Sequence, residues 1–285
     1  MKTINKVFSV GIALVLIVLV LFLALNATVP AFSASLGGLL ALAGTPTPPP
    51  GDPIPLKSIE GLTSLNATVN IQVNGMINGK RAQGNLTADL TTNDQKKSQI
   101  TVTGDLLGDI VAQVGGSLVG LFAPSKVDIY KVPDGTYIVI NGLFPVCVKP
   151  ADPKASAALD EMSPQSILKM LTSSDVARGK LVGDGTLNGT AVKHYVINGD
   201  AFLAAAKKSK DPKTKAFGNA LWSAEDADLY VDAKGGYPVA FSGSYSGTYE
   251  PLKFEGDFTV QVELTGVNQN TAVNLPASCN NPISR

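Results

Sequence analysis

The stretch Leu65–Asn74, LNATVNIQVN, decides the fold class of this chain. Its apolar residues occupy every second position and are separated by Asn, Thr and Gln. This period-two pattern predicts a β-strand with one buried and one solvent-exposed face. The dipeptide Asn78-Gly79 predicts a tight turn after this strand, and the alternation resumes over 85–90. The sequence therefore predicts an antiparallel β-hairpin near the start of a folded domain.

The same alternation recurs along the rest of the chain. It predicts further strands around 100–102, 127–132, 136–140, 192–197, 229–231, 237–241 and 254–264. Helical spacing predicts a helix over 107–121 with Asp105 as its cap, a second starting at Ser163-Pro164, and a third capped by Asp200. We therefore predict an α+β fold that is mainly β: an antiparallel sheet of roughly nine to eleven strands, apolar on one face, with amphipathic helices to cover that face.

The N-terminal segment has the composition of a membrane anchor. Lys2 and Lys6 precede an uncharged, aliphatic stretch, 8–25, that is long enough to cross the hydrocarbon core as a helix. The positive-inside rule places Met1 in the cytoplasm and the remaining chain outside. We expect an uncleaved signal-anchor at 1–26, a Pro-rich linker at 27–55 and one domain at 56–285, in the cell membrane as a single-pass protein. The alternative is cleavage after a signal peptide, for which 41–43 fits the small-residue pattern, and which would release a secreted protein.

Charge and cysteine content restrict the partners and the compartment. Acidic and basic residues balance at 23 each, so the chain lacks the basic excess that nucleic-acid binding requires. Its only two cysteines, Cys147 and Cys279, fall in the part expected to be exported, where a disulfide bond between them is the natural pairing. Two separate buried thiols are the alternative.

No residue pattern indicates catalysis, a metal site or a cofactor. The only histidine, His194, lies in a predicted strand without a nucleophile or metal-ligand spacing beside it, so we expect a structural role. The run 243–247, GSYSG, has Tyr245 where a hydrolase elbow needs its serine. The acidic residues over 225–232 lack the glycine-centred loop of a calcium site and fit a solvated strand face. We therefore expect that the protein is not an enzyme.

Several segments resemble a known family when taken in order. They are DP at 152–153, SPQSIL at 163–168, GTLNGT at 185–190, KHY at 193–195, DLYVD at 228–232, YPV at 237–239 and LP at 275–276. Their order resembles the LppX/LprG-type lipoproteins and, more distantly, the LolA/LolB lipoprotein carriers, over roughly Leu56 to Cys279. The resemblance implies a strongly curved antiparallel half-barrel whose apolar concave face, covered by helices, holds acyl chains. The chain departs from the lipoproteins in having no cysteine close after its hydrophobic segment.

The functional prediction combines this resemblance with the apolar pattern. We expect a membrane-anchored, extracytoplasmic protein of the cell envelope that binds a lipid or acylated ligand in an apolar cavity. The candidate lining residues, chosen for their apolar facing, are Leu107, Val111, Val114, Leu118, Ile167, Leu171, Phe241 and Phe258. The alternative is a structural or protein-interaction module of the envelope with a packed core, which would bind an envelope protein. An enzyme acting on lipid or glycan is the weakest reading.

Overall fold

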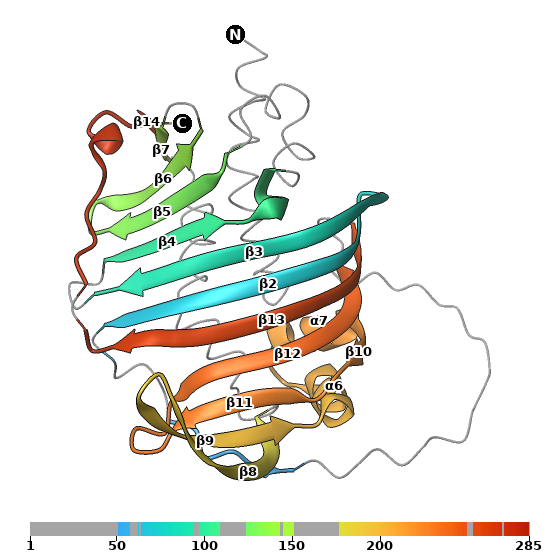
Figure 1. Cartoon of the computed structure of the whole chain (residues 1–285). Helices are drawn as coiled ribbons and strands as arrows, with labels where there is room; N and C mark the ends of the chain where they lie inside the picture. The colour runs from blue at the N-terminus through green and yellow to red at the C-terminus, as the bar shows by residue number, and fades with distance from the viewer. Residues whose placement is uncertain are drawn as a thin grey trace.

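The computed structural model shows a curved antiparallel sheet with helices on one of its faces (Figure 1). The residues that it describes are 51–57, 62, 64–93, 97–108, 124–142, 145–150, 177–249, 253–269 and 271–284. The strands are β1 (Asp52–Pro53), β2 (Leu65–Ile77), β3 (Lys80–Thr92), β4 (Ser98–Thr103), β5 (Lys126–Val132), β6 (Gly135–Asn141), β7 (Pro145–Lys149), β8 (Arg178–Leu187), β9 (Thr190–Ile197), β10 (Leu221–Ala224), β11 (Ala227–Asp232), β12 (Pro238–Tyr249), β13 (Phe254–Val267) and β14 (Ile283–Ser284). The helices with described bounds are α6 (Gly199–Lys208), α7 (Pro212–Ala220) and the short 3-10 helix η3 (Ala277–Cys279).

The described strands form a single open sheet. Their order is β1-β8-β9-β11-β12-β13-β2-β3-β4-β5-β6-β7-β14, and β10 pairs with β12 beside this path. The described pairs are antiparallel apart from β7 with β14, which run parallel. This agrees with the predicted mainly β fold and its half-barrel sheet. The sheet of described residues has 14 strands, more than predicted, because short strands such as β1, β10 and β14 show no clear alternation.

The β2–β3 hairpin confirms the pattern from which the fold was predicted. Its register runs from Leu65 opposite Thr92 to Ile77 opposite Lys80. The turn residues Asn78 and Gly79 both have positive φ, at 50° and 74°, as a two-residue hairpin turn requires. Buried and more exposed side chains alternate along β2, so the strand has one apolar and one polar face.

The apolar sides of the strands form one continuous core on the face that carries the helices, and we call this side the apolar face. Register places neighbouring apolar residues in rows across the sheet: Val73 lies opposite Phe258, and Phe258 lies opposite Tyr245. The helices α6 and α7 pack over the β10 and β12 end of this face. The other side of the sheet, the polar face, carries the intervening Asn, Gln, Ser, Thr and Asp side chains.

Capping side chains explain where the helices begin. Asn198, and not the predicted Asp200, is the N-cap of α6, because its side chain accepts a hydrogen bond from the backbone N–H of Ala201. Asp200 instead lies in the first turn, where its charge suits the helix dipole. Helix α7 was not predicted, although Asp211 as N-cap followed by Pro212 is a strong start signal. Of the helix predicted over 107–121, only 107 and 108 are described; they belong to a helical segment over 105–108, so Asp105 lies within the first turn, and 109–121 lie outside the described residues.

The predicted disulfide bond between Cys147 and Cys279 is present and joins β7 to η3. Both cysteines belong to a second, smaller buried cluster with Tyr130, Val139 and Val273. The bond ties the C-terminal segment to the β5–β7 end of the sheet across 132 residues of chain. A stable disulfide is typical of proteins outside the reducing cytosol.

The chain enters the sheet through β1. Asp52 and Pro53 pair with Gly179 and Arg178 of β8, and Ile54 is buried against the main core. The predicted anchor, 1–26, and most of the predicted linker, 27–55, lie outside the described residues, as does the helix predicted at 163. None of the described helices has the length and apolar character needed to span a bilayer.

Candidate functional site

The predicted lining residues that the structure describes all belong to the core of the apolar face. Leu107 and Phe241 are buried, and Phe258 is partly buried and packs against the same core. Phe241 and Phe258 come from neighbouring strands, β12 and β13. The other five predicted residues lie outside the described residues: Val111, Val114, Leu118, Ile167 and Leu171.

An aromatic group joins these strands to the two helices. We call it the Tyr245 cluster; its members are Phe202 of α6, Phe217 of α7, Tyr245 of β12, and Phe254 and Phe258 of β13. The Tyr245 ring centroid lies 5.8 Å from that of Phe202, 5.6 Å from that of Phe217 and 5.5 Å from that of Phe258. Tyr245 is therefore the point where sheet and helices meet.

The Tyr245 hydroxyl is a polar group without a hydrogen-bond partner in this apolar setting. Tyr245 is only 4 % exposed, and its oxygen is buried with no partner among the described residues. It lies over Gly243, close enough that a Cβ at that position would be 2.6 Å away, and the Phe241 ring lies beside it. Burial raises the pKa of the Tyr245 phenol, which therefore stays neutral and able to donate a hydrogen bond. A buried hydroxyl without a hydrogen-bond partner typically lowers the free energy of unfolding by about 1–3 kcal/mol.

Tyr245 was not predicted as a site residue. Gly243, Ser244, Ser246 and Gly247 surround the tyrosine, so the run 243–247 shows no apolar alternation of its own. Phe241 and Tyr245 lie four positions apart on one strand, which puts both side chains on the same face. Extending the alternation of Val239 and Phe241 by two steps could have found Tyr245.

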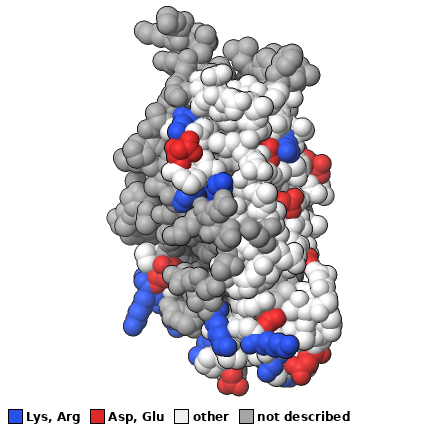
Figure 2. Space-filling view, turned by 90° about the vertical axis from the view of Figure 1, so that its left-hand side faces the viewer, with Lys and Arg blue, Asp and Glu red and all other residues white. Residues whose placement is uncertain are grey.

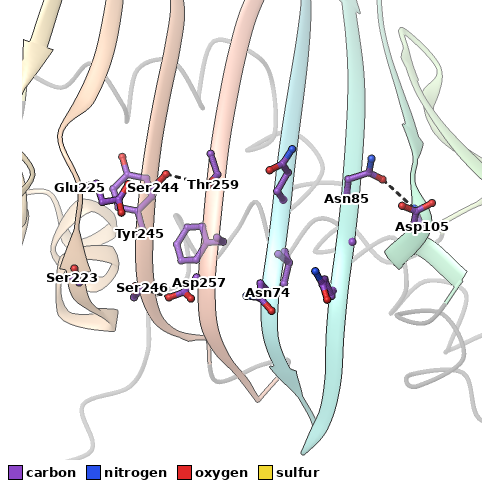
Figure 3. A pocket seen from close by; sticks show the side chains of 15 residues that line it. Asn74, Asn85, Asp105, Ser223, Glu225, Ser244, Tyr245, Ser246, Asp257 and Thr259 are labelled. Atoms are coloured by element: carbon purple, nitrogen blue, oxygen red, sulfur yellow. Dashed lines mark hydrogen bonds between the residues drawn. The ribbon is translucent and has the colours of Figure 1, made fainter.

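The polar face carries a trough on the opposite side of the same strands. It has a volume of about 600 Å³ and crosses β3, β2, β13 and β12 (Figure 3). Its lining residues are Gln72, Val73, Asn74, Gln83, Gly84, Asn85, Asp105, Ser223, Glu225, Ser244, Tyr245, Ser246, Asp257, Phe258 and Thr259. Val73, Tyr245 and Phe258 direct their side chains to the apolar face, so they form the floor of the trough with their backbones. This trough was not predicted.

The strand register arranges the polar side chains of the trough in two parallel rows. One row contains Asn85, Gln72, Thr259 and Ser244 in successive strands, and the other contains Gln83, Asn74, Asp257 and Ser246. Within the rows, Ser244 and Thr259 share a hydrogen bond of 3.1 Å, and Ser246 donates to Asp257 at 2.7 Å. Asp105 lies at the β3 end of the trough and Glu225 at the β12 end (Figure 3).

His194 contacts two side chains of the neighbouring strand β11. Its ring stacks on Tyr230 at 4.5 Å between centroids, and its Nε2 lies 2.7 Å from a carboxylate oxygen of Asp228. The nearby acidic residues also have local partners: Asp226 accepts from the Gly199 N–H at the start of α6, and Asp232 accepts from backbone N–H groups in the following turn. Among the described residues, no group of three or more His, Cys, Asp or Glu side chains is arranged to hold a metal ion.

Charges of both signs are intermingled on the side of the molecule shown in Figure 2. Lysine and arginine side chains lie next to aspartate and glutamate there, so the described residues form no extended basic surface in that view. The buried Asp128 shows the same local pairing, because it forms an ion pair with Lys126 at 3.0 Å.

Comparison with known proteins finds similar structures but no matching family. No family model matches the chain, and no curated protein matches it. LprF from Mycobacterium bovis is 15% identical over 76% of this chain and 90% of its own, with a TM-score of 0.41. A putative outer membrane lipoprotein-sorting protein domain from Vibrio parahaemolyticus is 8% identical over 78% of this chain and 92% of its own, with a TM-score of 0.24. A DUF1329 family protein from Desulfovibrio piger is 11% identical over 75% and 89%, with a TM-score of 0.22. Proteins of the LppX/LprG type and of the lipoprotein-sorting type, which the sequence resembles, are thus among the solved structures similar to this one.

Proposed function

We propose that this protein is a membrane-anchored, extracytoplasmic lipid-binding protein that holds or passes on acyl chains without making or breaking covalent bonds. The acyl chains lie between the apolar face of the sheet and the helices that pack on it. Residues 1–26 anchor the chain in the membrane, and the Cys147–Cys279 disulfide bond supports a location outside the reducing cytosol.

The observation that carries this proposal is the unpartnered hydroxyl of Tyr245 within an aromatic, otherwise apolar interface. Ligand sites are typically apolar spaces with a few polar groups that fix the orientation of the ligand. A fatty acid or ester matches both parts of this environment. Its chain packs against rings such as Phe202 and Phe258, and its carboxyl or ester oxygen accepts the hydrogen bond that Tyr245 can donate.

The contacts that hold the two sides of the interface are consistent with this role. The sheet side of the interface is rigid because β12 and β13 pair through a register of ten residues. The helix side is held mainly by the contacts of α6 and α7 with each other and with β10. Weakly held elements are those that open at low energetic cost, so we propose that an acyl chain enters by separation of α6 and α7 from β12.

The test is mass spectrometry of lipid extracted from the gently purified full-length chain. Gly243→Ala places a methyl group against the Tyr245 hydroxyl, whereas Gly183→Ala places one in open space on β8. Both variants keep the same anchor, so lipid bound by the anchor itself is equal in all samples. We expect the molar ratio of lipid to protein to fall in Gly243→Ala and to be unchanged in Gly183→Ala. An equal ratio in all three proteins would contradict the proposal.

A second candidate function, an interaction module of the cell envelope, is favoured by the β8 edge. Only Arg178 and Gly179 of β8 pair with β1, and farther along this strand Leu181 and Val182 are 48% and 58% exposed. An exposed apolar edge strand is a typical place for a partner to add a strand. Under this alternative, Leu181→Lys abolishes co-purification of a stoichiometric partner, whereas Val146→Lys, at another exposed site, does not.

A further inference from the structure

The trough on the polar face has the chemistry of a binding site different from the apolar one. Its side chains are carboxamides (Gln72, Asn74, Gln83, Asn85), hydroxyls (Ser223, Ser244, Ser246, Thr259) and carboxylates (Asp105, Glu225, Asp257). It lies on the opposite side of the sheet from the Tyr245 cluster, so a ligand in one site does not touch a ligand in the other.

The charges in the trough decide which ligands it can accept. Its lining includes three carboxylates and neither lysine nor arginine. Anionic ligands such as phosphate groups are therefore repelled, because nothing in the lining neutralises them. A divalent cation is also a poor match, since no described group of three carboxylate or histidine side chains is arranged as a metal site. Organic cations and uncharged ligands with many hydrogen-bonding groups remain, and the eight carboxamide and hydroxyl side chains, against three carboxylates, favour the uncharged class.

The hydrogen-bonding groups in the rows match the hydroxyls of a sugar. A hydroxyl group both donates and accepts, and carboxamides offer both functions side by side. Gln72, Asn74 and Gln83 are exposed along the trough, and their side chains form no hydrogen bonds with other described residues. Carboxylates accept strong, charge-assisted hydrogen bonds from sugar hydroxyls, and Asp257 has one oxygen beyond that bound to Ser246.

The shape of the trough favours a chain of sugars over a single ring. The rows cross from β3 to β12, which spans three strand spacings, or about 14 Å at the usual spacing of strands in a sheet. The volume of about 600 Å³ falls within the range of ordinary ligand sites. Asp105 and Glu225 at the two ends would bind the terminal sugars.

From these observations we infer that the polar face carries a second ligand site, a trough that binds a neutral oligosaccharide. The sheet then presents two sites back to back, one for acyl chains and one for sugars. The inference does not depend on lipid binding, because the trough uses side chains of the opposite face.

The test screens the full-length chain in detergent micelles against a glycan array and measures affinity for the best oligosaccharides by calorimetry. Gln72→Ala and Asp257→Asn remove groups within the rows, and Gln261→Ala removes the same amide as Gln72→Ala from an exposed position of the same face outside the trough. We expect neutral oligosaccharides to bind to the unmodified chain. Affinity should fall about tenfold in each trough variant, because each loses a charged or bidentate hydrogen bond to the sugar. Gln261→Ala should bind with the affinity of the unmodified chain.

Three results would overturn the inference. They are the absence of binding across the array, an equal loss of affinity in Gln261→Ala, and binding of a polyamine such as spermidine in place of neutral sugars, which would make the trough a cation site. Lipid extraction from the same samples keeps the two sites distinct, because the trough variants should retain the co-purified lipid.

Discussion

Replacing Tyr245 with Phe should stabilise the lipid-free protein and weaken lipid binding at the same time. The hydroxyl is buried without a partner among the described residues, and such a group typically costs about 1–3 kcal/mol. Phenylalanine keeps the ring contacts with Phe202, Phe217 and Phe258 while removing that cost. We therefore expect Tyr245→Phe to raise the free energy of unfolding of delipidated protein by about 1 kcal/mol or more.

The same substitution removes the donor that we assign to the ligand. One neutral hydrogen bond contributes about 1 kcal/mol, so the affinity for a fatty acid should fall roughly fivefold. Denaturant unfolding of delipidated protein measures the first effect, and displacement of a fluorescent fatty acid measures the second. The two effects have opposite signs, which a general disturbance of the core would not produce.

Tyr137→Phe is the matched control. It deletes the same atom from a buried tyrosine whose hydroxyl donates to Asp134 at 2.5 Å and accepts from Lys149 at 3.0 Å. We expect it to destabilise the protein and to leave fatty acid affinity unchanged. The reasoning is refuted if Tyr245→Phe destabilises the lipid-free protein, which would mean that the hydroxyl has a partner in the protein. It is refuted equally if the affinity does not change.

Three further measurements test the fold. Replacing both Cys147 and Cys279 with Ala should lower the free energy of unfolding by up to about 5 kcal/mol, because the bond closes a loop of 132 residues; a denaturant midpoint equal to that of the unmodified chain would contradict this. Asp128→Ala should cost about 1–3 kcal/mol in the same assay, because it strands the hydrogen-bond donors around a carboxylate that is 3% exposed. Burial raises the pKa of the Tyr245 phenol above its value of 10.0 in the unfolded chain. The free energy of unfolding should therefore fall above pH 10, and Tyr245 should contribute about 1.4 kcal/mol per pH unit to this fall. The decline should be shallower in Tyr245→Phe.

Strands such as β2 and β13 were predictable because buried and more exposed side chains alternate along them. Alternation is a local signal that identified β2, β3, β9 and β13, and the dipeptide Asn78-Gly79 identified the turn between β2 and β3. The disulfide bond was predictable because only two cysteines exist to pair. Both predictions need no knowledge of which strands become neighbours.

The order of strands and the sites that depend on it were not predictable in the same way. The trough brings together Gln72, Asn85, Ser244 and Thr259, which lie far apart in sequence and meet only through the register of four strands. The Tyr245 cluster likewise needs α6 and α7, and α7 carries little apolar periodicity of its own to indicate it. Short strands were missed because they show too little alternation. The start of α6 at Asn198 was missed because a cap depends on which of several neighbouring polar side chains accepts a hydrogen bond from the backbone.

Photolabelling tests the location of the acyl chain most directly. The full-length protein is incubated with a photoactivatable fatty acid, irradiated and digested, and the labelled peptides are identified by mass spectrometry. We predict saturable labelling of 199–220 and 238–258, the segments of α6, α7, β12 and β13 that form the Tyr245 cluster. Labelling confined to residues 1–26, or labelling that an excess of unlabelled fatty acid does not reduce, would contradict the account.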